Sequence, residues 1–170
     1  MQSSVAIRPA GPADLDQIAA IYNHEVLTGI STFDVEPQPV DQWQAQLASE
    51  RPGDQLLVAV VADSAMVLGY AYSSPYRTRP AYRRTRETSI YLAESARGRG
   101  IGRVLYADLL DRLRADSMHT ALALVAEPNP ASRRMHLSLG FEQVGTLREV
   151  GHKFGEYIDI TWYQKLLADE

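Results

Sequence analysis

Hydrophobic positions along the chain follow two different spacings. Short apolar runs bounded by turn residues alternate with longer segments in which apolar residues recur every three or four positions, as in Leu15, Ile18, Ala19 and Tyr22. The short runs are typical of strands and the longer segments of helices. We therefore predict strands at 5–10, 56–62, 67–73, 88–92, 120–126, 141–150 and 157–166, and helices from about 12 and over 40–50, 103–115 and 130–139. The resulting order, β-α-α-β-β-β-α-β-α-β-β, predicts an α/β fold around one mixed sheet.

Several boundaries between these elements carry clear local signals. Asn129 before Pro130 predicts a helix start, with the asparagine as N-cap and the proline at the first helical position, and Gly140 predicts its end. Asp63-Ser64 predicts a turn that joins the second and third strands into a hairpin. Residues 75–86 hold two prolines and no periodicity, so we predict a loop there.

The composition is that of an ordinary globular protein, most simply one domain over 1–170. Hydrophobic residues make up 45% and charged residues 22%, and no apolar run has membrane-spanning length. The absence of cysteine excludes disulfides, thiolate catalysis and cysteine-ligated zinc, and no metal site is predicted. Because residues 1–4 do not resemble a signal peptide, we expect a cytoplasmic protein.

The net charge of −4 argues against a general nucleic-acid binder, but the arginines are unevenly distributed. Eight of the fifteen lie between positions 77 and 103, where only Glu87 and Glu94 oppose them. A solvated basic face explains any single arginine of this set as well as a ligand does. For the cluster as a whole we favour an anionic ligand. The eight are Arg77, Arg79, Arg83, Arg84, Arg86, Arg97, Arg99 and Arg103.

A glycine-rich turn lies between the strand 88–92 and the helix 103–115. In Arg97-Gly98-Arg99-Gly100-Ile101-Gly102, three glycines occupy alternate positions and arginines flank them. Glycines let the main chain approach a ligand closely, and the first N–H groups of the following helix favour an anion such as phosphate. The turn therefore predicts a phosphate-binding site, with a purely structural glycine turn as the alternative.

Three kinds of phosphate-binding turn compete for this stretch. A P-loop requires Gly-Lys followed by Ser or Thr, which the chain lacks. A dinucleotide-binding turn requires G-x-G-x-x-G and an acidic residue about twenty positions later. The spacing here is G-x-G-x-G, and the strand 119–126 offers no convincing acid. Arg97, Gly100 and Gly102 instead match Arg/Gln-x-x-Gly-x-Gly/Ala, which resembles the turn that holds the pyrophosphate of coenzyme A in GCN5-related N-acetyltransferases (GNAT).

A second stretch resembles the same acetyltransferases. Asn129 opens a helix that is followed by Gly140-Phe141, as in the second signature of the family. Over nearly its whole length the chain resembles the phosphinothricin N-acetyltransferase branch of the GNAT family. The similar segments also include Asn23-His24, Ser74-Pro75-Tyr76, Arg79-x-Ala81-Tyr82, Glu87-x-Ser89-x-Tyr91, Arg133-x-Met135-His136 and Gly151-x-Lys153-x-Gly155.

The resemblance implies an acetyl-CoA-dependent N-acetyltransferase. The implied fold is a single mixed, mostly antiparallel sheet with splayed central strands and flanking helices, and the implied assembly is a homodimer. The implied acceptor is the α-amino group of a small amino acid such as phosphinothricin, arsinothricin or methionine sulfoximine, whose acetylation gives resistance to the toxin. A protein N-terminal or peptide acetyltransferase is one alternative, and a non-catalytic acyl-CoA sensor is another. The basic loop 76–86 favours the small anionic acceptor.

By resemblance, Glu87 is the general base. An amine must lose a proton to attack a thioester, and a nearby carboxylate can accept that proton. Because an ordinary glutamate has a pKa of about 4.3, burial must raise this pKa or water must relay the proton. Strand alternation places Glu87 on one face with Ser89 and Tyr91. An ion pair of Glu87 with Arg84 and Arg86 is the structural alternative.

His136 is the second catalytic candidate, and the branch has histidine at this position. It could act as an acid, a proton relay or a substrate contact, or it could be a histidine satisfied within the helix interface. The implied cofactor-binding residues are Ile90, Tyr91, Leu92, Arg97, Gly98, Arg99, Gly100, Ile101, Gly102, Arg103, Asn129 and Ser132. The implied substrate-binding residues are Phe33, Tyr76, Arg77, Arg79, Tyr82, Glu87, Thr88 and Ser89.

Two further side chains have competing interpretations. Phe33, in the loop 29–39, could roof a small-molecule pocket or plug the core. His24 could line a site, although a helix-end histidine satisfied by the main chain is the more ordinary arrangement.

Overall fold

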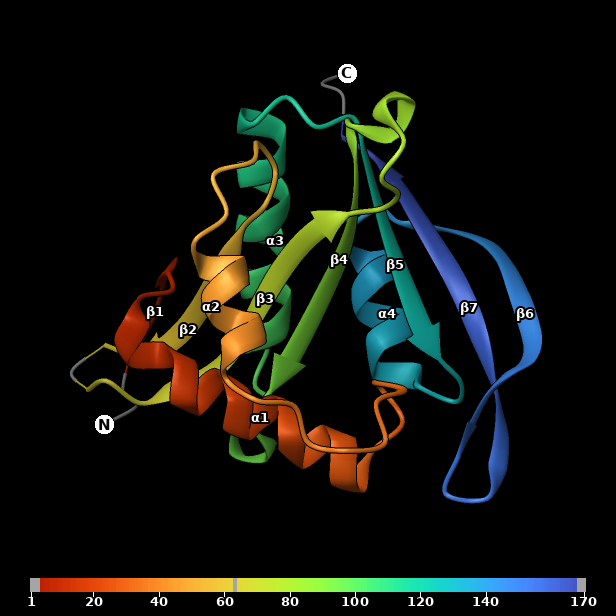
Figure 1. The fold of residues 1–170 in the computed structure, drawn as a ribbon, viewed down its shortest axis with the longest axis horizontal. Helices are drawn as coiled ribbons and strands as arrows, with labels where there is room; N and C mark the ends of the chain where they lie inside the picture. Colours follow the sequence, from red (N-terminus) through yellow and green to blue (C-terminus); the bar gives the residue numbers. More distant parts are fainter. Residues whose placement is uncertain (1–3, 63, 168–170) are drawn as a thin grey trace.

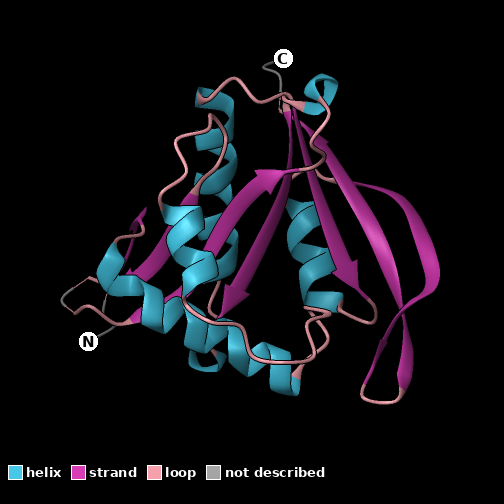
Figure 2. Cartoon of the chain, viewed as in Figure 1, coloured by secondary structure: helices cyan, strands magenta, loops and turns pink. Residues whose placement is uncertain are grey.

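The computed structural model describes residues 4–62 and 64–167. Within these residues, seven strands form one sheet (Figures 1 and 2). Neighbouring strands are antiparallel except for the central pair β4–β5, which is parallel. The strands, in their order across the sheet, are β1 (Val5–Pro9), β2 (Leu56–Val61), β3 (Val67–Pro75), β4 (Thr85–Leu92), β5 (Thr120–Ala126), β7 (Glu156–Leu166) and β6 (Glu142–Lys153). This arrangement confirms the predicted mixed, mostly antiparallel sheet.

Helices cover both faces of the sheet. In Figure 1, α1 (Leu15–Thr28) and α2 (Asp41–Leu47) lie in front of the sheet, on the side that we call the front face. Helices α3 (Ile101–Ala115) and α4 (Pro130–Ser138) lie behind it, on the back face. Each face has its own hydrophobic core, because the β-strand side chains alternate between the two. No helix in the described part of the chain is long and apolar enough to cross a membrane. Three short 3-10 segments complete the elements, at Pro12–Asp14, Pro80–Tyr82 and Glu94–Ala96.

The front core is built around a cluster of five aromatic rings. Neighbouring centroids in this aromatic cluster lie 5.1–6.2 Å apart, in edge-on and stacked contacts. Aromatic pairs at such distances stabilise a core beyond the effect of their buried area. The cluster fixes α1 and α2 on the strands that carry the candidate site, and its members are Tyr22, Trp43, Tyr70, Tyr72 and Tyr91.

Most element boundaries differ from the prediction by a few residues, and one difference concerns the site. We predicted a strand from Thr88, but β4 begins at Thr85, because Thr85–Glu87 pair with Thr120–Leu122 of β5. The charged residues Arg86 and Glu87 interrupt the apolar pattern here, so the pattern did not predict this part of the strand. The helix predicted over 40–50 is also shorter, ending at Leu47.

The central strands β4 and β5 form a fork. They pair over only three residues, and the last pair joins Glu87 to Leu122. Beyond it β4 continues to Leu92 and β5 to Ala126, and Figure 1 shows the two arrows moving apart. The predicted splayed strands are therefore present, and Glu87 lies where they separate.

Candidate functional site

Strand alternation divides the side chains of β4 between the two faces. Tyr91 packs in the front core, with Glu87 and Ser89 at the alternate positions before it. Ile90 packs in the back core, and Thr88 points the same way. Thr88 was expected to bind substrate together with Glu87 and Ser89, but its side chain is buried on the opposite face from them.

Glu87 is half-buried and takes part in no ion pair or side-chain hydrogen bond within the described residues. Burial raises the pKa of its carboxyl group, and the positive charge of Arg77 partly opposes that rise. The alternative of an ion pair with Arg84 or Arg86 is not found, since Arg84 is exposed and Arg86 is bound elsewhere. A carboxylate of this kind can accept a proton near neutral pH more readily than an ordinary glutamate.

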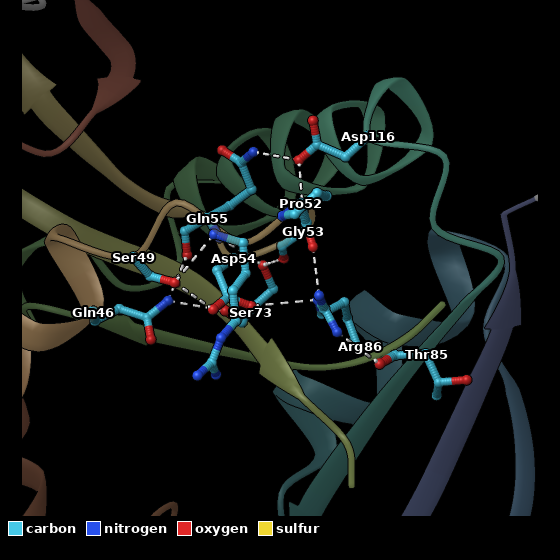
Figure 3. A network of polar contacts seen from close by, with 11 residues as sticks. Gln46, Ser49, Pro52, Gly53, Asp54, Gln55, Ser73, Thr85, Arg86 and Asp116 are labelled. Carbon is cyan, nitrogen blue, oxygen red and sulfur yellow. Dashed lines mark hydrogen bonds and ion pairs between the residues drawn. The ribbon is translucent and has the colours of Figure 1, made fainter. Parts of the chain in front are cut away.

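Arg86 belongs to a buried polar network at the start of β4 (Figure 3). Its guanidinium donates to the carbonyl of Pro52, and its Nε lies 3.4 Å from Oδ1 of Asp54. Asp116, which ends α3, accepts hydrogen bonds from the main chain of Gly53 at 3.0 Å and from Gln55 at 2.7 Å. The network therefore ties β4 to the loop before β2 and to the end of α3, and leaves the carboxylate of Glu87 unpaired.

The glycine-rich turn presents open main chain at the N-terminus of α3. Gly98 and Gly100 have φ angles of +73° and +78°, and a Cβ added to either would meet nothing within 4 Å. Gly102 is closely packed instead, because a Cβ there would lie 3.1 Å from Cδ1 of Leu92 and 3.5 Å from Sδ of Met135. Since Gly100 is the N-cap and has no side chain, the first N–H groups of α3 have no side-chain cap. The turn therefore fits a phosphate group.

The arginines of the turn have different roles. Arg97 donates to Glu25 of α1 at 3.1 Å and thereby fixes the turn to the front layer. Arg99 and Arg103 are exposed, and neither belongs to an ion pair of the described residues. These two guanidinium groups are therefore the ones available to an anion at the turn, with Ile101 as the first residue of α3 behind them.

Asn129 and Ser132 lie at the start of α4. As predicted, Asn129 is the N-cap: its Oδ1 accepts a hydrogen bond from the main-chain N–H of Ser132 at 3.0 Å. The amide nitrogen of Asn129 is not used by this cap. Ser132 in turn contacts His136, with its Oγ 3.2 Å from Nδ1.

His136 is buried behind the sheet, with only 3% of its surface exposed. Its Nδ1 lies 2.8 Å from the carbonyl oxygen of Ser132, and its Nε2 lies 3.2 Å from the hydroxyl of Tyr106. Burial lowers the pKa of its imidazole. This is the arrangement of a histidine satisfied within the helix interface, and a direct part in proton transfer stays a prediction. Tyr106 was not among the residues expected from the sequence.

The loop that carries Phe33 is fixed over the front face. The Phe33 ring, 37% exposed, occupies the space that a Cβ at Gly151 would fill, 2.2 Å away. Lys153 donates to the carbonyl of Thr32 at 2.8 Å, and Tyr22 donates to Asp34 at 2.6 Å. Strand β6 and helix α1 therefore hold the loop between them. Gly151 and Lys153 belong to a segment that resembles the family, but no local sequence signal predicted their contacts with this loop.

The loop between β3 and β4 carries the other candidate substrate contacts. The guanidinium of Arg77 lies 5.1 Å from the centroid of the Tyr76 ring, and the Tyr82 ring packs edge-on against Tyr76 at 5.4 Å. Arg77, Arg79 and Tyr82 are exposed. The structure thus brings Arg77 near Glu87, whereas no contact links Arg79 to it.

A cavity and an exposed histidine lie near the C-terminal end of β4. A cavity of about 610 Å³ opens between α1 and residues 92–95. His24 lines this cavity and is exposed, with its Nε2 4.0 Å from the carboxylate of Glu94.

Among the described residues, no group of three histidine, cysteine, aspartate or glutamate side chains could hold a metal ion.

Comparison with known proteins identifies the family. A family model described as an acetyltransferase (GNAT) domain matches residues 7–162. The chain belongs to the GNAT acetyltransferases. It is 47% identical to a phosphinothricin N-acetyltransferase from Streptomyces coelicolor over 97% of this chain and 98% of the relative. It is 39% identical to an L-methionine sulfoximine/L-methionine sulfone acetyltransferase from Pseudomonas paraeruginosa, over 95% and 94% of the two chains.

The fold of this GNAT domain is also similar to solved structures. A phosphinothricin acetyltransferase from Sinorhizobium meliloti, solved in complex with acetyl-CoA, superposes with a TM-score of 0.91 and 35% identity. The similarity covers 96% of this chain and 89% of that one.

The charge of Arg77 offers a direct test of the site geometry. Because a nearby cation favours the carboxylate form, the substitution Arg77→Gln is expected to raise the pKa of Glu87 further. An NMR titration of the Glu87 carboxyl carbon measures this shift. Arg134→Gln, on the exposed side of α4, is the matched control and should leave the pKa unchanged. An unchanged or lower pKa in Arg77→Gln would contradict the proximity of the two groups.

Proposed function

We propose that the protein is an acetyl-CoA-dependent N-acetyltransferase whose acceptor is the α-amino group of a small amino acid such as phosphinothricin, arsinothricin or methionine sulfoximine. The observation that carries the proposal is the position of Glu87 at the strand fork, as a half-buried carboxylate that forms no ion pair with any residue that the structure describes. The fork and the open glycine turn lie at opposite ends of one short segment, so a single extended cosubstrate can reach both.

The cosubstrate supplies its acetyl group as a thioester, and residues of the chain position it. Beyond Glu87, β4 does not pair with β5, so the main chain of Ile90, Tyr91 and Leu92 can bind the pantetheine arm as an added strand would. The turn 98–103 holds the pyrophosphate through main-chain N–H groups and the guanidinium groups of Arg99 and Arg103. The side-chain amide of Asn129 donates to the pantetheine arm.

Glu87 accepts the proton that the acceptor amine loses, directly or through one water molecule. The amine nitrogen then forms a bond with the acetyl carbon, the carbon–sulfur bond breaks, and the thiolate of coenzyme A takes up a proton. Burial of Glu87 suits this task, because a raised pKa brings a carboxylate closer to the pKa of the amine. For His136 we propose a positioning role, since both ring nitrogens already have hydrogen-bond partners within the chain.

The acceptor carries an α-carboxylate and a polar tetrahedral head, and the loop between β3 and β4 carries the exposed arginines Arg77 and Arg79. Arg77 and Arg79 can each bond two oxygens of such groups at once, and we propose Tyr76, Tyr82, Ser89 and Phe33 as the further acceptor contacts. The names of the relatives support this class of acceptor, since they include phosphinothricin and methionine sulfoximine acetyltransferases.

Substitution of Arg79 tests the acceptor site. Arg79→Ala is expected to raise KM for the amino acid by about 10- to 150-fold, because a hydrogen bond to a charged group contributes about 1.5–3 kcal/mol. KM for acetyl-CoA should stay the same. Arg134→Ala is the control for loss of an exposed arginine. An unchanged KM for phosphinothricin in Arg79→Ala would remove this residue from the acceptor site.

The activity itself is tested by supplying acetyl-CoA and a panel of acceptors while free thiol is measured. We expect the highest kcat/KM with phosphinothricin or its analogues and a low one with peptides. A higher kcat/KM with peptide N-termini than with amino acids would show that the protein is a peptide acetyltransferase instead. Binding of acetyl-CoA without turnover of any acceptor would favour a sensor.

We also propose a homodimer in the cytoplasm. β6 is an edge strand of the sheet, and large apolar side chains on β6, on β7 and in the turn between them are exposed by 49–68%. An uncovered edge with such a patch favours association with a second copy. Sedimentation at micromolar concentration should give twice the chain mass, and the monomer mass would contradict the proposal. The exposed side chains are Val144, Leu147, Val150, Phe154, Tyr157 and Leu166.

A further inference from the structure

We propose that Tyr106 is a positioning residue for acetyl transfer. Its hydroxyl connects the His136 ring to the hydroxyl of Thr88, and through Thr88 to the strand fork. The proposal rests on the proposed function, since it assigns a task within that reaction. Tyr106 lies on α3 and Thr88 on β4, while His136 lies on α4. The connection therefore joins both back helices to the strand that carries Glu87.

The connection is a continuous buried chain of polar contacts. The hydroxyl of Tyr106, a fully buried residue, lies 2.5 Å from Oγ1 of Thr88 and 3.2 Å from Nε2 of His136. Oγ1 of Thr88 lies 2.8 Å from the carbonyl oxygen of Leu122, and Nδ1 of His136 lies 2.8 Å from the carbonyl oxygen of Ser132. Since Leu122 forms the last pair between β4 and β5, the chain ends at the fork.

Both ends of this chain are carbonyl oxygens, which can only accept hydrogen bonds. The nitrogen Nδ1 of His136 must therefore carry a hydrogen, because its lone pair would otherwise face the carbonyl of Ser132. The hydroxyl of Ser132 is a second neighbour of this nitrogen at 3.2 Å. In the neutral ring Nε2 is then an acceptor, so Tyr106 donates to it, and Thr88 has one hydrogen for two neighbours, Tyr106 and Leu122.

A protonated His136 ring would reverse the chain. Nε2 would donate to Tyr106, Tyr106 to Thr88, and Thr88 to the carbonyl of Leu122. The protonation state of the His136 ring thus determines whether Thr88 donates its hydrogen bond to the carbonyl of Leu122 at the fork. Tyr106 from α3, Tyr163 from β7 and Phe141 pack on the ring, and no ion pair of the described residues includes His136. Among the hydrogen bonds of the described residues, the hydroxyl of Tyr106 is the one link between the His136 ring and Thr88.

This link holds the main chain on both sides of Thr88. Glu87 is the residue before Thr88, and the strand segment proposed to bind pantetheine begins two residues after it. Misplacement of reacting groups by about 1 Å can cost on the order of 100-fold in rate. Loss of the Tyr106 hydroxyl should therefore act on kcat more than on the affinity for acetyl-CoA.

The chain offers a matched pair of tyrosines for the experiment. Tyr163 is also fully buried and stacks on His136 at 5.6 Å, but its hydroxyl has no hydrogen-bond partner among the described residues. Tyr106→Phe and Tyr163→Phe thus remove the same atom from two rings packed on the same imidazole. We expect kcat to fall roughly 10- to 100-fold in Tyr106→Phe and to change less than twofold in Tyr163→Phe.

Nitrogen-15 NMR of the imidazole gives a readout that does not depend on activity. In the wild type we expect the tautomer with hydrogen on Nδ1 and a hydrogen-bonded Nε2. In Tyr106→Phe the Nε2 resonance should move to the position of an unbonded acceptor, and in Tyr163→Phe it should stay. A wild-type ring with hydrogen only on Nε2 would overturn the proposal, even if acetyl transfer to every acceptor tested also failed.

If Tyr106→Phe does not fold, a second pair of variants, at Thr88, tests the same proposal. Thr88→Val removes the hydroxyl with little change of shape, and Thr88→Ser retains it. The proposal predicts that kcat falls at least tenfold in Thr88→Val and is largely preserved in Thr88→Ser. Equal kcat values in the two Thr88 variants, or in Tyr106→Phe and Tyr163→Phe, would overturn it.

Discussion

The substitution Glu87→Gln is expected to lower kcat for acetyl transfer by about 10²- to 10⁴-fold, the usual effect of removing a general base. Glutamine keeps the size of the side chain but cannot accept the proton of the amine. KM for acetyl-CoA should be unchanged, because no cofactor-binding group is altered. In the wild type, activity should increase as the pH rises through the raised pKa of Glu87, since the carboxylate is the active form.

The control for Glu87→Gln is Glu50→Gln, an exposed glutamate outside the site. It should leave both kcat and the pH profile unchanged. A loss of less than about tenfold in Glu87→Gln, with the acidic limb of the pH profile unmoved, would assign Glu87 a structural role.

The second large effect is expected at the glycine turn, where Gly100→Val should abolish detectable binding of acetyl-CoA. The φ angle of +78° is unfavourable for valine, and the new side chain would occupy the open space beside the main chain that is proposed to hold the pyrophosphate. Strain of this kind costs roughly 1–3 kcal/mol of stability, so thermal unfolding must be measured with binding. Calorimetry with acetyl-CoA gives the affinity.

Gly155→Val separates strain from location. Gly155 has a φ angle of +79° and equally open surroundings, but it lies in the turn between β6 and β7. This variant should be destabilised to a similar extent and still bind acetyl-CoA. If a folded Gly100→Val protein bound acetyl-CoA with wild-type affinity, the turn would not be the pyrophosphate site.

Local sequence signals were sufficient for much of the architecture. Apolar runs located the strands, and the cap at Asn129 lies where Asn-Pro predicted it. The turn has open main chain at Gly98 and Gly100, in agreement with the close approach of a ligand that the alternate glycines predicted. These features depend on residues close together in the chain, which is why the sequence alone could predict them.

Features that depend on tertiary partners were not predicted. Arg86 is buried because it contacts Pro52 and Asp54, which lie in a loop distant in the sequence. An arginine is not expected in a buried strand, so the start of β4 was not predicted. Thr88 was grouped with the substrate contacts, although strand alternation directs it to Tyr106. The partner of Phe33 is a glycine more than one hundred residues away, Gly151, and local patterning carries no signal for such a contact.

A crystal structure with coenzyme A and phosphinothricin bound together tests the central claim most directly, because it shows which carboxylate lies beside the acceptor amine. We predict that the amine nitrogen lies about 2.6–3.2 Å from the Glu87 carboxylate, or one water molecule away, on the front face of β4. The pyrophosphate should contact the main chain of the glycine turn. An amine bound on the back face beside Thr88, or out of reach of Glu87, would contradict the account.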